Sequence, residues 1–289
     1  MILYYLLKLL SFAAANLPAA ISYSIASAVG DLAYCLWPRG RRNMSKSIAA
    51  VLRQEANSRE VQKNVRDGLR NYYKSVVDVL RYASPKKGFF ETIDIIGLEN
   101  VERAFAAGKG VLIIGLHMGN LDLGVRALSQ AGYPINAIVQ NLGFGPFDRF
   151  VQGPREASGL KLISESEGIL QVLNILKKNE ALALMIDGRC FETGFLVQLG
   201  NKYIMVPSGL AALALKTGAR VLPCGLIRSS NTRFHGIVCK PVEFKPTGDF
   251  EEDARELTQQ TVRVLEGMAR IFADQWYIFH DLIRDNVRR

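Results

Sequence analysis

The sequence predicts an α/β protein with a mostly parallel central sheet flanked by helices, preceded by an N-terminal apolar and amphipathic helical region. Three observations support this prediction. From about residue 92, short β-rich runs alternate with helical windows through short links, which is typical of parallel sheets covered by helices. The first 38 residues are nearly free of charge, and the segment that follows them is strongly basic.

Length and composition exclude several classes of protein. The chain has 289 residues, of which 49% are apolar and 22% charged, so it can form one large α/β domain with an appendage. No tract rich in Gly, Pro or Ser is longer than a turn, which excludes a mainly disordered, collagenous or coiled-coil chain. Charges and glycines interrupt most apolar runs, so several transmembrane spans are excluded too.

The N-terminal segment, residues 1–38, has a membrane-like composition. Its only charged residues are Lys8 and Asp31, and it lacks the basic start of a secretory signal peptide, so we expect it to be retained. Ala19–Trp37 is nearly as long as the roughly 20 residues that span a bilayer. Its serines, Gly30 and Asp31 make a helix or hairpin lying in one leaflet the better prediction. An ordinary buried hairpin that covers the domain is the alternative.

The net charge of +9 is concentrated in residues 39–87, which we call the basic collar. This segment carries thirteen Lys and Arg against four Asp and Glu. Such a surface binds nucleic acid or anionic lipid head groups, and the adjoining apolar segment favours anionic membrane lipids, with no nucleic acid expected. Five of the bases recur at helical spacing, opposite a stripe of apolar residues; they are Arg59, Lys63, Arg66, Arg70 and Lys74. An amphipathic helix with a cationic face is predicted; the alternative is a solvated face on a helix packed against the domain.

The remaining elements follow in order from residue 92. Candidate strands are 92–96, 111–116, 135–139, 161–164, 181–186, 195–199, 220–227 and 236–244. Candidate helices are 98–107, 120–131, 146–157, 165–178, 207–217 and 251–274. Several strands are apolar without alternation, as expected when both faces are covered. The plausible boundary, 84–88, separates membrane-associating helices in residues 1–88 from an α/β domain in residues 89–289.

Cysteine and histidine usage argues against a structural metal. The four cysteines, at positions 35, 190, 224 and 239, show no CxxC or zinc-finger spacing, and the chain has only three histidines. We therefore expect no metal site. Scattered cysteines in apolar runs are typical of reduced thiols in a cytoplasmic domain.

The strongest candidate for chemistry is His117, which lies where the strand 111–116 ends. Reacting groups of open α/β sheets collect beyond the carboxyl ends of strands. Gly119 permits a sharp turn after the histidine, Asn120 can cap the next helix, and Asp122 falls in the first turn of that helix. With a turn between them, Asp122 can fold back onto the imidazole, fix its tautomer and leave the other nitrogen as a general base. No serine or cysteine stands in a nucleophile elbow, so the base is expected to activate a substrate hydroxyl.

This H-x4-D pattern resembles the first motif of the lysophospholipid acyltransferase superfamily. More narrowly, the chain is similar to the branch that contains the lipid A late acyltransferases and the phosphatidylinositol mannoside acyltransferases. The resemblance extends from about Arg41 to Phe279. Besides residues 117–122, it includes the segments 155–159, 185–189, 194–200 and 206–219 and the pair Gln275-Trp276.

The resemblance implies a glycerolipid acyltransferase-like fold and acyl transfer from a thioester to a hydroxyl of a membrane lipid. His117 would be the base and Asp122 would orient it. The acyl donor would be acyl-CoA or an acyl carrier protein, used as a co-substrate, and no cofactor is implied. The resemblance also implies a monotopic enzyme on the cytoplasmic face of the inner membrane.

Two departures from the branch bear on the acceptor. The lipid A branch usually has Glu at the position of Asp122, and an aromatic pair where this chain has Gln198-Leu199 before Gly200. The mannoside branch has an acidic residue in the segment that matches 195–197, where this chain has none; Glu192 is the candidate substitute.

Further polar residues are candidates for binding substrate. Arg149, Arg155 and Arg189 follow helix or strand ends near the proposed cleft, and guanidinium groups suit the phosphates of a glycolipid or of coenzyme A. Asp187, at the end of the strand 181–186, could bind a sugar hydroxyl or pair with Arg189. Backbone N–H groups near Gly119 and Asn120, or an arginine, could stabilise the oxyanion. Each arginine could equally be a surface or helix-capping residue.

Two alternatives to glycolipid acylation stay open. Within the same enzyme class, the acceptor could be a simple lysophospholipid. A different class of function is a non-enzymatic protein that binds anionic membranes or nucleic acid through the basic collar, although this alternative gives His117 and Asp122 no role.

Overall fold

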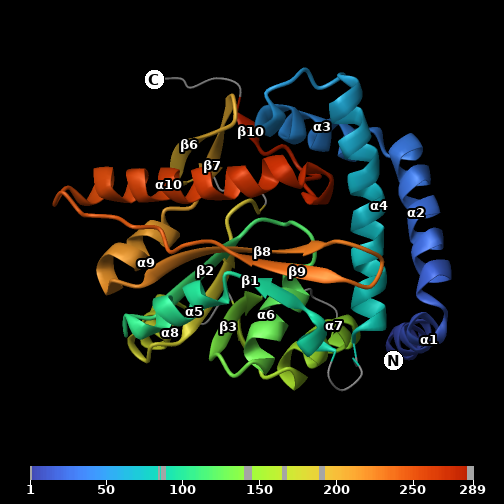
Figure 1. Cartoon of the computed structure of the whole chain (residues 1–289), viewed down its shortest axis with the longest axis horizontal. Helices are drawn as coiled ribbons and strands as arrows, with labels where there is room; N and C mark the ends of the chain where they lie inside the picture. Colours follow the sequence, from blue (N-terminus) through green and yellow to red (C-terminus); the bar gives the residue numbers. More distant parts are fainter. Residues whose placement is uncertain are drawn as a thin grey trace.

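The fold is an α/β core with a group of N-terminal helices along one side (Figure 1). In a computed structural model of the chain, the described residues are 2–83, 85, 89–139, 145–164, 168–188 and 193–284. The predicted fold class is confirmed: a seven-stranded, mostly parallel sheet is flanked by helices.

The sheet has the strand order β1-β9-β8-β2-β5-β3-β4. Its strands are β1 (Asp94–Ile96), β2 (Val111–Gly115), β3 (Ile135–Val139), β4 (Lys161–Ser164), β5 (Ala181–Met185), β8 (Arg220–Arg228) and β9 (Phe234–Val238). Five strands, β8 to β4 in that order, are parallel. β9 pairs antiparallel with β8 and parallel with β1. Strands joined by a short hairpin must be antiparallel, so the strand direction reverses at the short β8–β9 connection.

Helices cover both faces of the sheet. The helices of this part are α5 (Leu98–Ala106), α6 (Leu121–Gln130), α7 (Gly145–Ala157), α8 (Gly168–Lys177), α9 (Gly209–Thr217) and α10 (Phe250–Ile271). Alternate side chains of β2 point to opposite faces: Val111 and Ile113 join the core with α5 and α6, whereas Leu112 and Ile114 join the core with α8, α9 and α10. A strand buried on both faces needs apolar residues at every position, which explains its unbroken apolar sequence.

A second, smaller sheet has the order β10-β7-β6. Its strands are β6 (Phe195–Leu199), β7 (Lys202–Val206) and β10 (Ile283–Arg284), and all its pairs are antiparallel. β6 was predicted from the sequence, whereas β7 and β10 were not, and the last long strand lies at Phe234–Val238 and not at the predicted 236–244. β7 was missed because it follows β6 after only two residues, within one continuous apolar and polar stretch.

Four helices form the N-terminal region: α1 (Ile2–Asn16), α2 (Ala19–Leu36), α3 (Pro38–Leu52) and α4 (Arg59–Arg81). α2 lies alongside α4, with α1 at the foot of this pair and α3 at its top (Figure 1). Arg81 at the end of α4 donates to the carbonyls of Ala14 and Leu17, which fixes the corner between α1 and α2.

The N-terminal helices share their core with the rest of the chain. Val61, Val65 and Leu69 of α4 are fully buried and pack with Ala273 and with Met44 of α3. The predicted boundary at 84–88 falls mostly outside the described residues, so the division at residue 88 remains a prediction.

Part of the predicted cationic face of α4 contacts α2, whereas Arg59 and Lys63 are exposed to solvent. Arg66 and Arg70 donate to the carboxylate of Asp31 on α2, at 2.7 and 2.8 Å, and Lys63 pairs with Asp67 on the same helix. Arg66 and Arg70 therefore hold α2 and α4 together. Of the basic collar, Arg39 and Arg42 are exposed at the start of α3, next to the exposed Trp37.

Candidate active site

The candidate active site is built at the carboxyl ends of two neighbouring parallel strands, β2 and β5. Their register pairs Gly115 with Met185. His117 and Asp187 follow these two residues at equal distances along the chain, so the strands deliver both side chains to the same place. The position of His117 follows from the end of its strand in the sequence, but its neighbour across the sheet, Asp187, is identified only by the strand order.

His117 is paired with Asp187. The Nδ1 atom of His117 lies 2.7 Å from Oδ1 of Asp187, and the backbone N–H of His117 donates to the same carboxylate at 2.9 Å. Trp276 donates its Nε1–H to Oδ2 of Asp187 at 2.8 Å. The aspartate is completely buried, whereas 48% of the histidine side chain is exposed. With Nδ1–H donated to Asp187, Nε2 carries the lone pair and is available to a substrate.

The pKa of His117 is raised above its ordinary value of 6.5. Burial opposes this change because it disfavours the charged ring, but the hydrogen bond and the negative charge of Asp187 outweigh it. The imidazolium form is thus stabilised, which suits a group that takes up a proton during a reaction.

The expectation that Asp122 contacts and orients His117 is wrong in this structure. Asp122 accepts a hydrogen bond at 2.5 Å from Nε of Arg155, and it lies 3.7 Å from a terminal nitrogen of Arg126. Asp122 is the second residue of α6, after the N-cap Asn120 and Leu121. Its carboxylate contacts Arg155 and Arg126 and not His117. Asp187, a candidate to bind a sugar hydroxyl or to pair with Arg189, is the partner of the histidine and is closed to solvent. Its pairing with Arg189 stays a prediction, because Arg189 lies outside the described residues.

The backbone after His117 is fully used within the chain. Gly119 donates its N–H to the carbonyl of Gln275 at 2.8 Å, and Asn120 donates its N–H to the carbonyl of Leu226 at 3.0 Å. These N–H groups are therefore not available for the predicted contact with an oxyanion. Gly119 has φ +57°, and a Cβ atom there would lie 1.7 Å from the carbonyl oxygen of Leu226. Only glycine fits this turn.

Asn120 is buried and has a structural task. Its side-chain oxygen accepts from the N–H of Leu123 at 3.3 Å, which caps α6 as the sequence predicted. Its side-chain amide donates to Oδ2 of Asp78 on α4 at 3.0 Å. No signal in the sequence linked these two residues, which are 42 positions apart.

Residues 275–277 contact the turn of residues 117–120, which we call the histidine loop. Tyr277 donates its N–H to the carbonyl of His117 at 2.8 Å, and Met118 forms an isolated β-bridge with Trp276. Gln275 is buried, and its side chain exchanges two hydrogen bonds of 2.9 Å with the backbone of Arg228. Gln275 and Trp276 therefore connect Arg228, at the end of β8, to Asp187, the partner of His117. This role was not predicted from the sequence.

The three candidate arginines have different surroundings. Arg155 binds Asp122 and Gln152. Arg149 is exposed on α7 and lies over the ring of Tyr4 of α1, at 5.8 Å. Arg189 lies outside the described residues, as does Glu192. The structure thus places Arg155 beside the H-x4-D motif and Arg149 at the contact between α7 and α1.

A buried ion pair between Asp78 and Arg228 contacts Asn120 of the histidine loop. Asp78 of α4 is fully buried and pairs with Arg228 at the end of β8, and Tyr23 of α2 donates its hydroxyl to the same carboxylate at 2.7 Å. Burial raises the pKa of the Asp78 carboxyl, and the positive charge of Arg228 opposes this rise. These three residues were not predicted, because no local pattern marks them.

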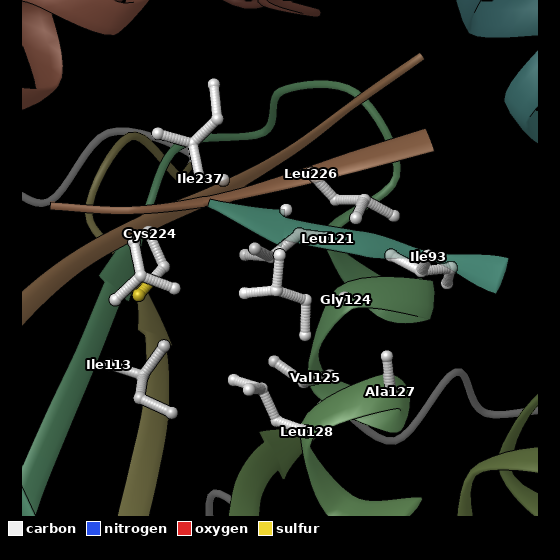
Figure 2. A pocket seen from close by; sticks show the side chains of 14 residues that line it. Ile93, Ile113, Leu121, Gly124, Val125, Ala127, Leu128, Cys224, Leu226 and Ile237 are labelled. Atoms are coloured by element: carbon white, nitrogen blue, oxygen red, sulfur yellow. The ribbon is translucent and has the colours of Figure 1, made fainter. Parts of the chain in front are cut away.

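A small apolar cavity lies between α6 and the sheet (Figure 2). Its lining includes Ile113, Leu121, Val125, Leu226 and Ile237. The volume of about 20 Å³ is that of roughly one water molecule. In this conformation the cavity is too small to receive an acyl chain.

Within the described ranges, no three His, Cys, Asp or Glu side chains converge as ligands for an ion. The contact between His117 and Asp187 has the geometry of a general base with its orienting carboxylate.

Almost the whole chain matches one protein family. The family model of bacterial lipid A biosynthesis acyltransferases matches residues 1–285. The chain belongs to this family. The match includes the N-terminal helices and the site described above, so the resemblance expected from the motifs is confirmed.

Individual relatives in the lipid A acyltransferase family are distant. The chain is 27% identical over 138 residues to the phosphatidylinositol mannoside acyltransferase of Mycolicibacterium smegmatis, a match that covers 46% of this chain and 45% of that protein. The enzyme of the same name from Mycobacterium tuberculosis (strain H37Rv) is 29% identical over 44% of this chain and 42% of its own length. The chain thus spans less than half the length of these relatives.

One further relative and one solved structure align over more of the chain. The lipid A biosynthesis palmitoleoyltransferase of Escherichia coli K12 is 21% identical over 81% of this chain and 77% of its own length. Among solved structures, the 1-acyl-sn-glycerophosphate acyltransferase PlsC of Thermotoga maritima aligns over 86% of this chain and 97% of its own, with a TM-score of 0.39 and 12% identity.

Proposed function

We propose that this protein is a membrane-associated O-acyltransferase that moves a fatty acyl chain from an acyl thioester to a hydroxyl group of a lipid. The observation that carries the proposal is the pair His117–Asp187: a half-exposed imidazole whose Nδ1 is held by a buried carboxylate. Family membership supports the same class of reaction.

The residues suggest a single-step mechanism. Nε2 of His117 removes the proton of the acceptor hydroxyl as the oxygen attacks the thioester carbonyl. The imidazolium is stabilised by Asp187 and returns the proton to the departing sulfur. The carbon–sulfur bond breaks, an ester bond forms, and a free thiol leaves. No covalent enzyme intermediate is required.

The N-terminal helices support a membrane-facing role. By length and composition alone, α2 could cross a bilayer. Only 28% of it is buried in the protein, so most of the helix is free to contact lipid. Its outer face exposes Ile21, Ile25 and Val29. Its inner face binds Arg66 and Arg70 of α4 through Asp31. Because a spanning α2 would draw these charges into lipid, we place α2 in the surface of one leaflet.

The basic collar and the free thiols support a location of the protein on the cytoplasmic face of the membrane. Arg39 and Arg42 are exposed beside Leu36 and Trp37, a combination that binds anionic lipid head groups. Cys224 and Cys239 are free thiols, which suits a reducing compartment. The proposed location is the cytoplasmic face of the inner membrane.

The proposed acceptor is a glycolipid such as a lipid A precursor or a phosphatidylinositol mannoside, since the relatives carry these two names. The proposed donor is acyl-CoA or an acyl carrier protein. Arg155, beside the H-x4-D motif, is the candidate for contacting a phosphate of donor or acceptor, with Arg149 and Arg189 as further candidates. Acylation of a lysophospholipid is the second candidate reaction, and it differs only in the acceptor.

Mass spectrometry of acyl transfer tests the proposal. Native protein and His117→Ala are each given a pool of acyl-CoA and acyl carrier protein donors with a polar lipid extract of the source organism. A lipid that gains one acyl chain only with the native protein identifies donor and acceptor together. Transfer at a comparable rate by His117→Ala would refute the mechanism. If both proteins bind vesicles and neither transfers an acyl chain, the protein is a binding protein and the proposed function is wrong.

A further inference from the structure

The buried carboxylate of Asp78 has no task in the reaction, yet it joins three parts of the molecule. It accepts hydrogen bonds from Tyr23 of α2 and from Asn120 of the histidine loop, and it pairs with Arg228 of β8. A fully buried charge costs several kcal/mol unless every partner is in place. Such an arrangement therefore permits little movement of the groups that it joins.

The same residues surround the turn that carries His117. Asn120 is three positions beyond the histidine, and its own N–H is held by the carbonyl of Leu226, two residues before Arg228 on β8. Ser75, one helical turn before Asp78 on α4, has its hydroxyl 3.3 Å from the carbonyl oxygen of Gly119. α4 thus contacts the turn at two successive residues.

Arg228 extends this network to the other side of the site. Its backbone is held by the side chain of Gln275 at 2.9 Å. The next residue, Trp276, donates to Asp187, the partner of His117. The chain of contacts from Asp78 therefore reaches both members of the catalytic pair: His117 through Asn120, and Asp187 through Arg228, Gln275 and Trp276.

We propose that Asp78 is a positioning residue for acyl transfer. Acting through Asn120 and Arg228, it holds His117 in hydrogen-bonding contact with Asp187. Tyr23 connects this group of Asp78, Asn120 and Arg228, which we call the brace, to α2. The inference rests on the proposed function. It adds a physical link between the helix with the exposed apolar face and the catalytic loop, since α2 lies against α4 along its length (Figure 1).

The test uses variants that leave the buried ion pair intact, because removal of Asp78 would strand the charge of Arg228 and threaten folding. Asn120→Ser keeps a good cap for α6 but is too short to reach Asp78. Tyr23→Phe removes only the hydroxyl that donates to Asp78. Asn100→Ser is the matched control: Asn100 of α5 is similarly buried and makes one long-range hydrogen bond of 3.0 Å, to Val238.

Two readouts separate positioning from stability. The first is the titration of the His117 ring in nuclear magnetic resonance spectra, which requires no substrate. The second is kcat and KM for acyl transfer by the full chain on vesicles. Asn120→Ser should lower kcat by about 10- to 100-fold, as expected for a lost hydrogen bond to a charged group. Its KM should change by less than about threefold, because a group that acts only on the transition state leaves KM unaltered.

The pKa of His117 supplies the decisive comparison. It should fall in Asn120→Ser and, to a smaller extent, in Tyr23→Phe, because a looser contact with Asp187 stabilises the imidazolium less. Asn100→Ser should lose thermal stability without changing the pKa or kcat. If Asn120→Ser keeps the native pKa and kcat, or if Asn100→Ser changes them equally, Asp78 is only a structural residue and the inference is wrong. Failure of the native protein to transfer acyl groups would refute the proposed function, while the ring titration would still decide the role of the brace.

Discussion

At the scale of single residues, the choice of carboxylate decides how the site works. Both Asp122 and Asp187 are near the catalytic loop, but only Asp187 contacts the imidazole, and Asp122 is bonded to Arg155. The two aspartates therefore have different effects on the titration of His117, and this difference can be measured.

Asp187→Asn should lower kcat/KM by about 10²- to 10⁴-fold, as in other enzymes where the carboxylate that orients a catalytic histidine is replaced by an amide. The base is active when neutral, so activity of the native protein should rise with pH through the raised pKa of His117. Without the charge of Asp187, burial alone remains, and the pKa should fall below its ordinary value. The measurement is the acid limb of the pH–rate profile, which should move to lower pH.

Asp122→Asn is the matched control for this experiment. It should leave the acid limb where it is, whatever its effect on the rate, because its carboxylate is held by arginines. An acid limb that moves with Asp122→Asn and stays in place with Asp187→Asn would mean that Asp122 is the partner of His117 during turnover.

At the scale of helices, α2 and α4 are held together by one acid and two bases. Arg70 binds Asp31 through two nitrogen atoms, at 2.8 Å each, and Arg66 adds a third hydrogen bond. The hydrogen bonds from Arg70 and then Arg66 lower the pKa of Asp31 from 3.8 to about 2. Gly30, next to this acid, allows the close approach, because a Cβ atom there would lie 2.6 Å from the backbone of Arg70.

Asp31→Asn should lower the free energy of unfolding by at most about 1 kcal/mol, since the group is partly exposed and screened by solvent. A carboxyl with a lowered folded-state pKa stabilises the fold above its unfolded value of 3.8, and this contribution is lost as the pH falls through about 2. Urea unfolding at pH 7 and at pH 2 to 3 should show a difference between native protein and variant that shrinks in acid. Glu55→Gln, which removes an exposed charge before α4, should show no such convergence.

At the scale of the whole molecule, exposed apolar side chains gather at the N-terminal side. Leu9 and Phe12 of α1 and Ile25 of α2 are all more than half exposed, and these helices lie together at one edge of the protein (Figure 1). Each would gain about 1.5–3 kcal/mol on entering the apolar part of a leaflet. The face therefore has the composition of a surface that docks on a membrane.

The double variant Leu9→Glu/Ile25→Glu should bind vesicles of anionic lipid at least about tenfold more weakly than the native protein, because two apolar contacts are replaced by charges. Vesicle co-sedimentation measures the change. Leu170→Glu is the control, since Leu170 is 74% exposed and belongs to α8, a helix on the opposite side of the molecule from α1 and α2 (Figure 1). Equal loss of binding in the double variant and the control would show that binding does not use the N-terminal helices.

The order of strands and helices was largely predictable, because each rests on local signals. The apolar runs of β2 and β5 and the cap at Asn120 can be recognised within a few residues. Elements without a local signal were missed: β7 follows β6 too closely, and β10 has only two residues. The amphipathic helix α4 was predictable from its spacing, but the ion pairs of Arg66 and Arg70 were not, because their partner, Asp31, lies on another helix.

The sequence by itself determined the fold class, the family, and the position of His117 at the end of its strand, since these follow from periodicity and from a short motif. Only the tertiary structure decided which carboxylate binds the histidine, why the N–H groups of the loop are unavailable, and how Asp78 reaches Asn120. The physical reason is the same in each case. Hydrogen bonds form between groups that the folded chain brings within about 3 Å, and in these contacts the partners are 42 to 156 positions apart in the sequence.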